Sequence, residues 1–239
     1  MTLKNYLQKN RQQIEKDLHH TKQWAYFSPA IYCQYQIMLP MAQRYAHGSL
    51  IDLGCGDMPY REAILPLVTS YDGQDLFPRS DSVRYVCDLE SMTPIKENQY
   101  DTALLIEVLE HLPHPWLALA EIYRILKPGG ILVLSVPHLS RLHDEPHDYY
   151  RYTHYGLRCL LRDAGFDIIE VAEKGSIFSF LGHQLSTLTT ALVWQIPVLK
   201  KIVYFLNEWL VTRLCYGLDL WLNKSKLLPL GYVVAARKR

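Results

Sequence analysis

Four carboxylates that each close a strand-like run are the residues of this chain whose spacing indicates chemistry. They are Asp52, Asp75, Asp88 and Glu107. If the runs are parallel strands of one sheet, their carboxyl ends meet at one crevice, which is where open α/β sheets bind ligands. Any one of these acids alone would be explained as a solvated strand end or a helix N-cap. Four in succession indicate a ligand with hydroxyl groups, such as a ribose, because an ionised carboxylate accepts hydrogen bonds from both hydroxyls.

A glycine turn follows the first of these acids. Gly54 and Gly56 come directly after the run that contains Asp52. Glycine at such a turn permits unusual φ angles and a close approach of the backbone to a ligand. Nicotinamide dehydrogenases use a similar turn, but their Gly-x-Gly-x-x-Gly fingerprint requires a third glycine where this chain has Pro59. The dehydrogenase class is therefore disfavoured.

Together these motifs resemble the class I S-adenosylmethionine-dependent methyltransferases, and among them a bacterial branch similar to methyltransferase type 11. The resemblance extends over residues 45–172 and the final strand-like run, and Met58 departs from it because many members have a third glycine there. It implies an enzyme that binds S-adenosylmethionine. The residues implied to bind the cofactor are Asp52, Gly54, Cys55 and Gly56 at the methionine part, Asp75 and Leu76 at the ribose, Asp88 and Leu89 at the adenine, and Glu107 beside the reacting methyl.

Alternating strand-like and helical runs predict a single α/β domain with helices on both faces of the sheet. We expect a Rossmann-like, seven-stranded sheet, for which the resemblance implies the strand order 3-2-1-4-5-7-6. Helices are predicted over 3–24, 29–45, 115–126 and 155–164. The expected parts of the domain are an N-terminal helical cap (1–47), the core (48–174), an apolar helical insertion (175–228) and the last strand (229–239).

The segment 138–153, after the fifth predicted strand, is too polar for a core and holds three of the ten histidines. It resembles the Pro-x-Asp-Tyr-Tyr-Arg-Tyr-Thr signature of the same methyltransferase branch. Because histidine is the usual general base near neutral pH, we expect His111, His147 and Tyr149 to assist the acceptor. The alternative is a structural loop held by hydrogen bonds, with Thr153 capping the next helix.

The Glu-x-x-Glu-His run from Glu107 to His111 adds a metal hypothesis. With His147 it resembles the metal site of small-RNA 2'-O-methyltransferases and of ubiquinone-pathway O-methyltransferases. Two carboxylates and two imidazoles, from Glu107, Glu110, His111 and His147, suit a divalent ion that acidifies an acceptor hydroxyl. The same run also occurs in family members without a metal, where the histidine packs or touches substrate.

Composition narrows the class of partner. The formal net charge is +1 and the sequence has no long basic run. The positive patch typical of a nucleic-acid binder is therefore missing, and no nucleic-acid partner is expected. Five separate cysteines predict reduced, structural thiols. A polar first stretch, without the pattern of a signal peptide, predicts a cytoplasmic protein.

The stretch 175–222 is unusually apolar, with only five charges and three of the five tryptophans. Polar residues interrupt it, so a spanning helix is not expected. We expect this apolar stretch to be covered by the sheet of the same chain, by a second subunit in a homodimer, or by a membrane surface. The last of these would place the protein peripherally at the inner face of the membrane.

The predicted function is methyl transfer from S-adenosylmethionine to a small-molecule, sugar or lipid-linked acceptor, at oxygen. The alternative is a catalytically inactive module that binds S-adenosylmethionine and serves interaction or membrane docking. That module would bind the cofactor tightly without turnover.

Overall fold

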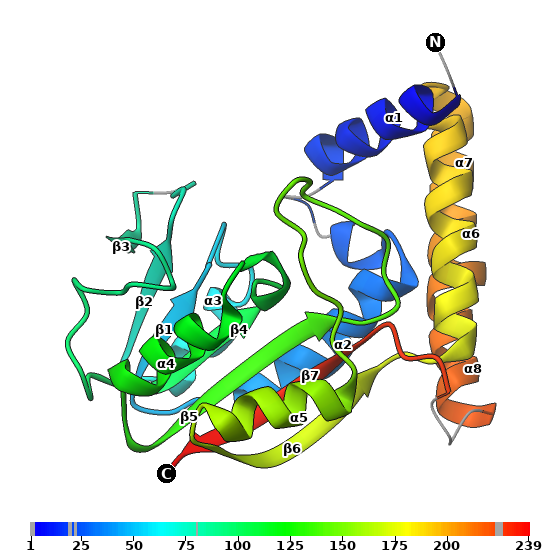
Figure 1. Ribbon diagram of the computed structural model, residues 1–239. Helices are drawn as coiled ribbons and strands as arrows, with labels where there is room; N and C mark the ends of the chain where they lie inside the picture. Colours follow the sequence, from blue (N-terminus) through cyan, green and yellow to red (C-terminus); the bar gives the residue numbers. More distant parts are fainter. Residues whose placement is uncertain (1–2, 19–20, 22, 80, 223–226) are drawn as a thin grey trace. The chain divides into compact units, whose positions relative to one another are not determined.

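The computed structural model describes residues 3–18, 21, 23–79, 81–222 and 227–239 of the chain (Figure 1). It divides into two compact units. The sheet unit comprises Ile37–Ala172 and Gly231–Arg239, and the helical unit comprises Met1–Gln36 and Glu173–Leu230.

Within the described residues, one seven-stranded sheet has the order β3-β2-β1-β4-β5-β7-β6. The pairs from β3 across to β5 are parallel, and β7 runs antiparallel to β5. The predicted Rossmann-like fold class and strand order are therefore confirmed. The strands are β1 (Ser49–Leu53), β2 (Ser70–Asp75), β3 (Val83–Val86), β4 (Tyr100–Ile106), β5 (Leu126–Pro137), β6 (Phe166–Lys174) and β7 (Gly231–Lys238).

The central strands form the core of the sheet unit. Ile51 and Leu53 of β1, Leu105 of β4 and Leu134 of β5 are fully buried in one hydrophobic cluster. Strands that are covered on both faces need apolar residues without alternation, which is why their sequences read as continuous apolar runs. The surrounding helices and turns are α3 (Arg61–Ile64), η2 (Leu65–Leu67), η3 (Leu109–His111), α4 (Pro115–Ile125) and α5 (His154–Asp163) (Figure 1).

The helical unit is built around α6 (Ile177–Val193), which packs along α7 (Pro197–Leu206), the π-helical η4 (Asn207–Arg213) and α8 (Leu214–Leu222) (Figure 1). We call residues 177–222 the helical hairpin. Its two ends are tied together, because the Asp219 carboxylate accepts hydrogen bonds from the backbone N–H groups of Ser176 and Ser179 at 2.7 and 2.9 Å. Among the described residues, no helix has both the length and the hydropathy needed to span a bilayer.

Two further helices precede the sheet along the chain. The helix predicted over 3–24 is shorter than expected: α1 (Leu3–Leu18) ends at Leu18, and Trp24 begins the 3-10 turn η1 (Trp24–Tyr26). Asn10 of α1 donates a hydrogen bond to the Ala191 carbonyl of α6 at 2.7 Å. The next helix, α2 (Pro29–Tyr45), has the predicted bounds.

Candidate active site

The turn after β1 has a backbone that requires glycine. Gly54 and Gly56 have φ angles of +63° and +49°, a region in which a Cβ is unfavourable. A Cβ on Gly54 would also lie 2.6 Å from Cγ2 of Val108, whereas a Cβ on Gly56 would meet only open space. Met58, at the position of the missing third glycine, also has a positive φ, of +52°. The turn therefore leaves room for a ligand above Gly56.

Asp75, at the end of β2, fixes this turn. One of its carboxylate oxygens accepts a hydrogen bond from the Gly56 backbone N–H at 2.9 Å, and the other accepts from the Phe77 N–H at 2.9 Å. Each oxygen retains a lone pair, so the carboxylate can also accept from two hydroxyl groups. This geometry fits the ribose role predicted for Asp75.

Gln74 of β2 holds the same turn and was not among the predicted site residues. Its side chain is fully buried. Its carbonyl oxygen accepts from the Gly54 N–H at 3.2 Å, and its amide nitrogen donates to the Cys87 carbonyl. Gln74 thus joins the turn after β1 to the segment after β3. The sequence carried no direct signal of this role, because the burial of Gln74 follows from the pairing of β2 with β1 and β3. A buried polar side chain then needs hydrogen-bond partners.

Asp52 is buried under the turn, on the last part of β1. It accepts a hydrogen bond from the Tyr71 hydroxyl at 2.6 Å. Burial raises the pKa of the Asp52 carboxyl to about 7; the Tyr71 hydroxyl opposes this shift and the nearby Asp75 charge adds to it. The carboxyl therefore titrates near neutral pH. Its contact with the methionine part of a cofactor stays a prediction.

The other residues predicted to bind the cofactor differ in exposure. Glu107 has a positive φ of +54°, and its carboxylate accepts from the Ser135 hydroxyl at 2.9 Å. Asp88 is exposed and accepts from the Glu90 N–H, while Leu76 is 47% exposed. Cys55 and Leu89 are buried, and their contact with a ligand stays a prediction.

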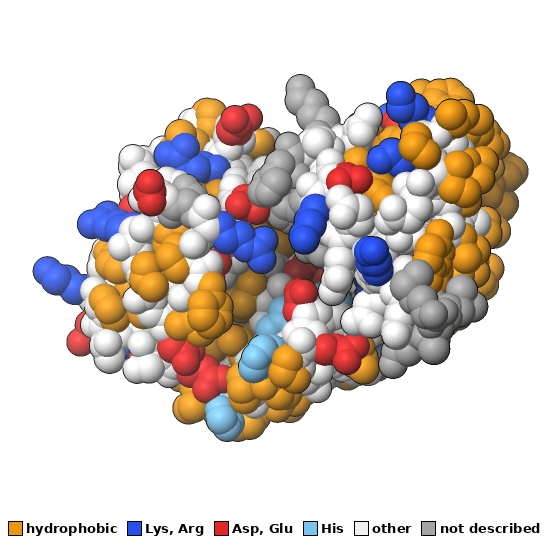
Figure 2. Space-filling view, turned by 90° about the horizontal axis from the view of Figure 1, so that it is seen from above, with side chains coloured by type: hydrophobic (Ala, Val, Ile, Leu, Met, Phe, Trp, Pro, Cys, Tyr) orange, Lys and Arg blue, Asp and Glu red, His pale blue; other side chains and the backbone are white. Residues whose placement is uncertain are grey.

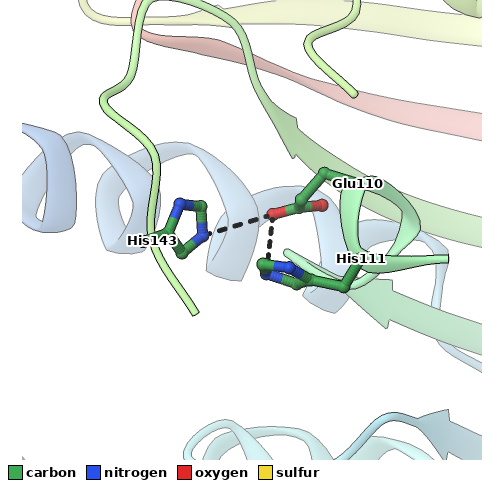
Figure 3. Close-up of side chains that lie close together, drawn as sticks. All are labelled: Glu110, His111 and His143. Carbon is green, nitrogen blue, oxygen red and sulfur yellow. Dashed lines mark ion pairs between the residues drawn. The ribbon is translucent and has the colours of Figure 1, made fainter. Parts of the chain in front are cut away.

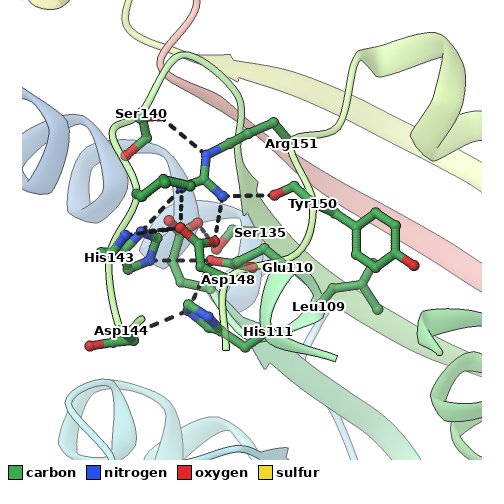
Figure 4. A network of polar contacts seen from close by, with 12 residues as sticks. Leu109, Glu110, His111, Ser135, Ser140, His143, Asp144, Asp148, Tyr150 and Arg151 are labelled. Carbon is green, nitrogen blue, oxygen red and sulfur yellow. Dashed lines mark hydrogen bonds and ion pairs between the residues drawn. The ribbon is translucent and has the colours of Figure 1, made fainter. Parts of the chain in front are cut away.

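The segment between β5 and α5 is fastened to the η3 turn. The Glu110 carbonyl accepts from the Tyr149 N–H at 2.9 Å, and the Leu109 carbonyl accepts from the Tyr152 hydroxyl at 3.1 Å. At its end, the Thr153 hydroxyl caps α5 by accepting from the Gly156 N–H at 3.1 Å. The segment is therefore held by hydrogen bonds, and it also carries ionisable side chains to η3 (Figure 4).

Glu110, His111 and His143 form one cluster of ionisable side chains (Figure 3). The fully buried Glu110 carboxylate has one oxygen 3.7 Å from Nε2 of His111 and 3.9 Å from Nε2 of His143. The two imidazole rings meet edge to face, with centroids 4.8 Å apart. In the part of the chain that the structure describes, this is the group whose donor atoms are close enough to hold a metal ion.

The cluster corrects the metal-ligand set expected from the sequence. Glu107 lies outside it, and His143 stands where His147 was expected. The ring of His147 instead has its Nδ1 3.2 Å from the Tyr149 hydroxyl. His147 reaches the cluster through its backbone, because its carbonyl oxygen lies 2.6 Å from Nδ1 of His111. The reason is the path of the loop, which brings position 143 rather than 147 over Glu110.

An ion pair holds His143 in this position. The Asp148 carboxylate accepts hydrogen bonds from the backbone N–H of His143 at 2.9 Å and from both terminal nitrogens of Arg151 at 2.6 and 2.7 Å (Figure 4). Burial alone would raise the pKa of Asp148, but the hydrogen bonds from Arg151 and the His143 N–H outweigh it and lower the pKa to about 2. Burial and the nearby His111 lower the pKa of His143.

We expect Asp148→Asn to destabilise the protein by about 3 kcal/mol at neutral pH, because it leaves Arg151 without its charged partner in a partly buried site. The folded-state pKa of Asp148 lies below its unfolded value. Its contribution is therefore present above about pH 4 and is lost as the pH falls toward 2. Urea unfolding of both proteins at several pH values measures this. Asp144→Asn, at a side chain that is 76% exposed, serves as the control, and an equal loss in both variants would contradict the assignment.

Comparison with known proteins places the chain in a family. A family model described as a methyltransferase domain matches residues 36–171, which is more than half of the chain. The chain belongs to this methyltransferase family. The resemblance to class I S-adenosylmethionine-dependent methyltransferases is thereby confirmed.

Curated relatives match part of the chain. Ubiquinone biosynthesis O-methyltransferases from Xanthomonas oryzae pv. oryzae and Pseudomonas paraeruginosa are each 29% identical to it, over 103 and 100 residues. The first match covers 38% of this chain and 43% of the relative, and the second covers 36% and 43%. The matches thus span less than half the length of these relatives.

Solved structures share the fold over a larger part of the chain. An S-adenosylmethionine-dependent methyltransferase from Archaeoglobus fulgidus has a TM-score of 0.59 at 13% identity, covering 95% of this chain and 99% of that one. Phosphoethanolamine N-methyltransferase 2 from Haemonchus contortus, solved with phosphomonomethylethanolamine and S-adenosylhomocysteine, has a TM-score of 0.57 at 17% identity. This match covers 96% of this chain and 60% of that one. At such identities the likeness shows the fold.

Proposed function

We propose that the protein transfers the methyl group of S-adenosylmethionine to an oxygen of a small-molecule, sugar or lipid-linked acceptor, with His111 as the general base. The observation that carries this proposal is the fixed His111 ring. A carbonyl oxygen only accepts hydrogen bonds, so Nδ1 of His111 carries the proton that it donates to the His147 carbonyl at 2.6 Å. With that proton on Nδ1, Nε2 is the nitrogen of the ring that can accept a proton.

The residues at the turn after β1 suit the cofactor. The positive φ angles of Gly54 and Gly56 and the space beside Gly56 allow a ligand to approach the backbone. Asp75 would hold the ribose hydroxyls, and Glu107 would lie beside the methionine part. When bound, the cofactor supplies a methyl group on a positively charged sulfur, which leaves readily in an in-line displacement.

His111 would take the proton that an acceptor hydroxyl loses as its oxygen bonds to the methyl carbon. The proton would go to Nε2 of His111, and the bound cofactor would supply the methyl group and keep the electron pair of its carbon–sulfur bond. The resulting imidazolium would be stabilised by Glu110 at 3.7 Å and by Asp144 at 3.9 Å. His147 would act through its carbonyl, which orients the His111 ring, and Tyr149 through its hydroxyl beside the exposed His147 ring.

Oxygen is the proposed target because the cluster supplies a base, which methyl transfer to a hydroxyl needs more than transfer to an amine or thiolate. The names of the curated relatives, which are O-methyltransferases, agree with this choice. Incubation of the protein with methyl-labelled cofactor and fractionated cell extract tests it. Label that appears in an alkali-stable ether of a lipid or aqueous fraction supports the proposal, and label confined to amines would overturn the choice of oxygen.

The divalent metal expected from the sequence stays a prediction, with Glu110, His111 and His143 as its donors. One carboxylate and two imidazoles are a donor set that divalent ions accept. Elemental analysis of the purified protein decides between a bound ion and a free base. Full turnover in the presence of a chelator would exclude a catalytic metal. One ion bound per chain would instead make His111 a metal ligand and not a base.

Asp75→Ala is expected to weaken cofactor binding by about 1–3 kcal/mol, because a charged acceptor of hydroxyl hydrogen bonds is lost. This corresponds to roughly a fivefold to 150-fold rise in the dissociation constant. Calorimetry with S-adenosylhomocysteine measures the change. Asp81→Ala, at an exposed aspartate of the next loop, is the control. Unchanged affinity in Asp75→Ala would refute the ribose assignment.

A further inference from the structure

The helical hairpin has apolar side chains on its surface and small or polar side chains in its interior, the inverse of a helix whose outer face meets water. On α6 the exposed side chains include Leu181, Leu185, Leu188 and Leu192, whose spacing of four, three and four places them on one face of the helix. The buried side chains of the same helix are small or polar. They are Ser179, Gly182, Ser186, Thr187, Thr190 and Ala191.

The returning arm repeats the inversion. Asn207 and Thr212 of η4 are buried, while Phe205 and Trp209 are 61% and 51% exposed. At the end of α8, Trp221 is 75% exposed. Figure 2 shows hydrophobic side chains gathered over these helices.

The buried polar groups have partners inside the helical unit. Ser186 and Asn207 both donate to the Phe27 carbonyl, at 2.9 and 2.7 Å, and Thr212 donates to the Tyr26 carbonyl at 3.1 Å. Small polar side chains thus join the hairpin by hydrogen bonds to the backbone of Tyr26 and Phe27. Hydrogen bonds and close packing of small side chains are how helices associate in a lipid environment. A surface that faces water would carry the opposite pattern.

The charges of the hairpin favour an anionic lipid surface over a second copy of the chain as its partner. Neither acid is exposed: Glu208 pairs with Arg213 at 2.9 Å, and Asp219 is buried against backbone N–H groups. Lys201 is exposed, whereas Lys200 lies over the Trp194 ring at 5.1 Å and pairs with Asp17 of α1 at 3.6 Å. An isologous contact between two hairpins would bring Lys201 to a surface on which the hairpin exposes no acid. An anionic lipid headgroup complements this lysine.

We propose that the helical hairpin docks on a phospholipid bilayer, lying along one leaflet with its leucine and aromatic face among the acyl chains. Exposed tryptophans and an exposed lysine beside a broad apolar face are features of helices that bind at the membrane interface. The proposal concerns the helical unit alone and does not depend on the reaction proposed for the sheet unit.

Flotation of the purified full chain with vesicles of phosphatidylethanolamine and phosphatidylglycerol tests the proposal. We expect the wild type to float with the vesicles, and Leu185→Glu and Phe205→Glu each to lower the partition coefficient at least about tenfold. Leu117→Glu, at an exposed position of α4 in the sheet unit, is expected to bind like the wild type. Lys201→Gln is expected to weaken binding at low salt only.

Brominated lipids provide a second readout that does not require a charge to be introduced into the hairpin. Bromine on the acyl chains is expected to quench the exposed Trp209 and Trp221 in single-tryptophan variants, and to spare the buried Trp194. Three results would overturn the proposal. They are vesicle binding that the glutamate variants leave unchanged, a wild-type protein that binds no vesicles, and a dimer in light scattering that the same glutamate variants dissociate.

Discussion

Replacing His111 by alanine is expected to lower methyl transfer roughly 100- to 10,000-fold, the range for the loss of a general base. The side chain has one nitrogen committed to the His147 carbonyl and the other next to Glu110. Cofactor binding should be unchanged, because His111 belongs neither to the turn after β1 nor to the end of β2 at Asp75. The rate of label transfer from methyl-labelled cofactor to the active extract fraction measures the effect.

Two further variants separate chemistry from structure. In His111→Asn the amide can still donate to the His147 carbonyl, but it provides no base, so we expect the same loss of rate as in His111→Ala. His114→Ala removes an exposed histidine that pairs with Glu90 at 2.9 Å, and the rate should be unaffected. A His111→Asn variant with near wild-type rate would show that the residue acts only by holding the loop.

The same variants distinguish an enzyme from a cofactor-binding module without activity. If the wild type binds S-adenosylhomocysteine but labels no fraction, and His111→Ala is indistinguishable from it, the module is the better description. Loss of transfer in His111→Ala, with retained binding, supports the enzyme.

Asp52→Asn is expected to have the largest pH-dependent effect on stability. The folded-state pKa of Asp52, about 7, is raised above the unfolded value because the carboxyl is buried. A raised pKa means that the contribution to stability is full below the unfolded pKa and is lost as the pH rises through 7. Asparagine does not titrate, so the wild type should lose roughly 3 kcal/mol relative to the variant between pH 5 and pH 8.

Urea unfolding of the ligand-free proteins across this range measures the difference. Tyr71→Phe is the matched variant, because it removes the hydroxyl that lowers the Asp52 pKa and should move the transition to higher pH. Parallel stability curves for wild type and Asp52→Asn would mean that the Asp52 carboxyl is solvated.

The titration of Asp52 also connects stability to ligand binding. A positively charged group placed next to a carboxyl favours its ionised form. If the methionine part of the cofactor lies near Asp52, binding at pH 6 should therefore release a proton. Calorimetry in two buffers with different ionisation enthalpies detects this release. Equal heats of binding in both buffers would mean that no proton is released and that Asp52 does not lie next to the bound ligand.

The sheet and its acids could be predicted because their signals are local. Asp52 and Asp75 end parallel strands, and Gly54 and Gly56 follow at positive φ. Each of these features depends on a few neighbouring residues. The order of strands followed from the resemblance, since the pairing of β7 between β5 and β6 joins residues far apart in the chain.

The composition of the histidine cluster could not be predicted because it depends on a loop path. Which residue of 138–153 reaches Glu110 is set by hydrogen bonds such as Tyr149 N–H to the Glu110 carbonyl and by the Asp148–Arg151 pair. Sequence spacing carries no information on these contacts, so His147 was expected where His143 stands. The buried state of Asp52 was hidden for the same reason, because it depends on Tyr71 of the neighbouring strand.

The low charge of residues 175–222 was evident, but the side that each residue faces was not. A leucine at every third or fourth position is typical of a helix face turned toward a core. Here the tertiary contacts of Ser186 and Asn207 with the Phe27 carbonyl turn the polar face inward. The leucine face is exposed as a consequence.

Calorimetric titration of the purified protein with S-adenosylhomocysteine tests most directly whether carboxylates at neighbouring strand ends bind a nucleoside. The geometry at Gly56 and Asp75 predicts binding at a single site, weakened roughly fivefold to 150-fold in Asp75→Ala and unchanged in Asp81→Ala. No heat of binding with either S-adenosylhomocysteine or S-adenosylmethionine would contradict the cofactor assignment and the methyl transfer proposed from it.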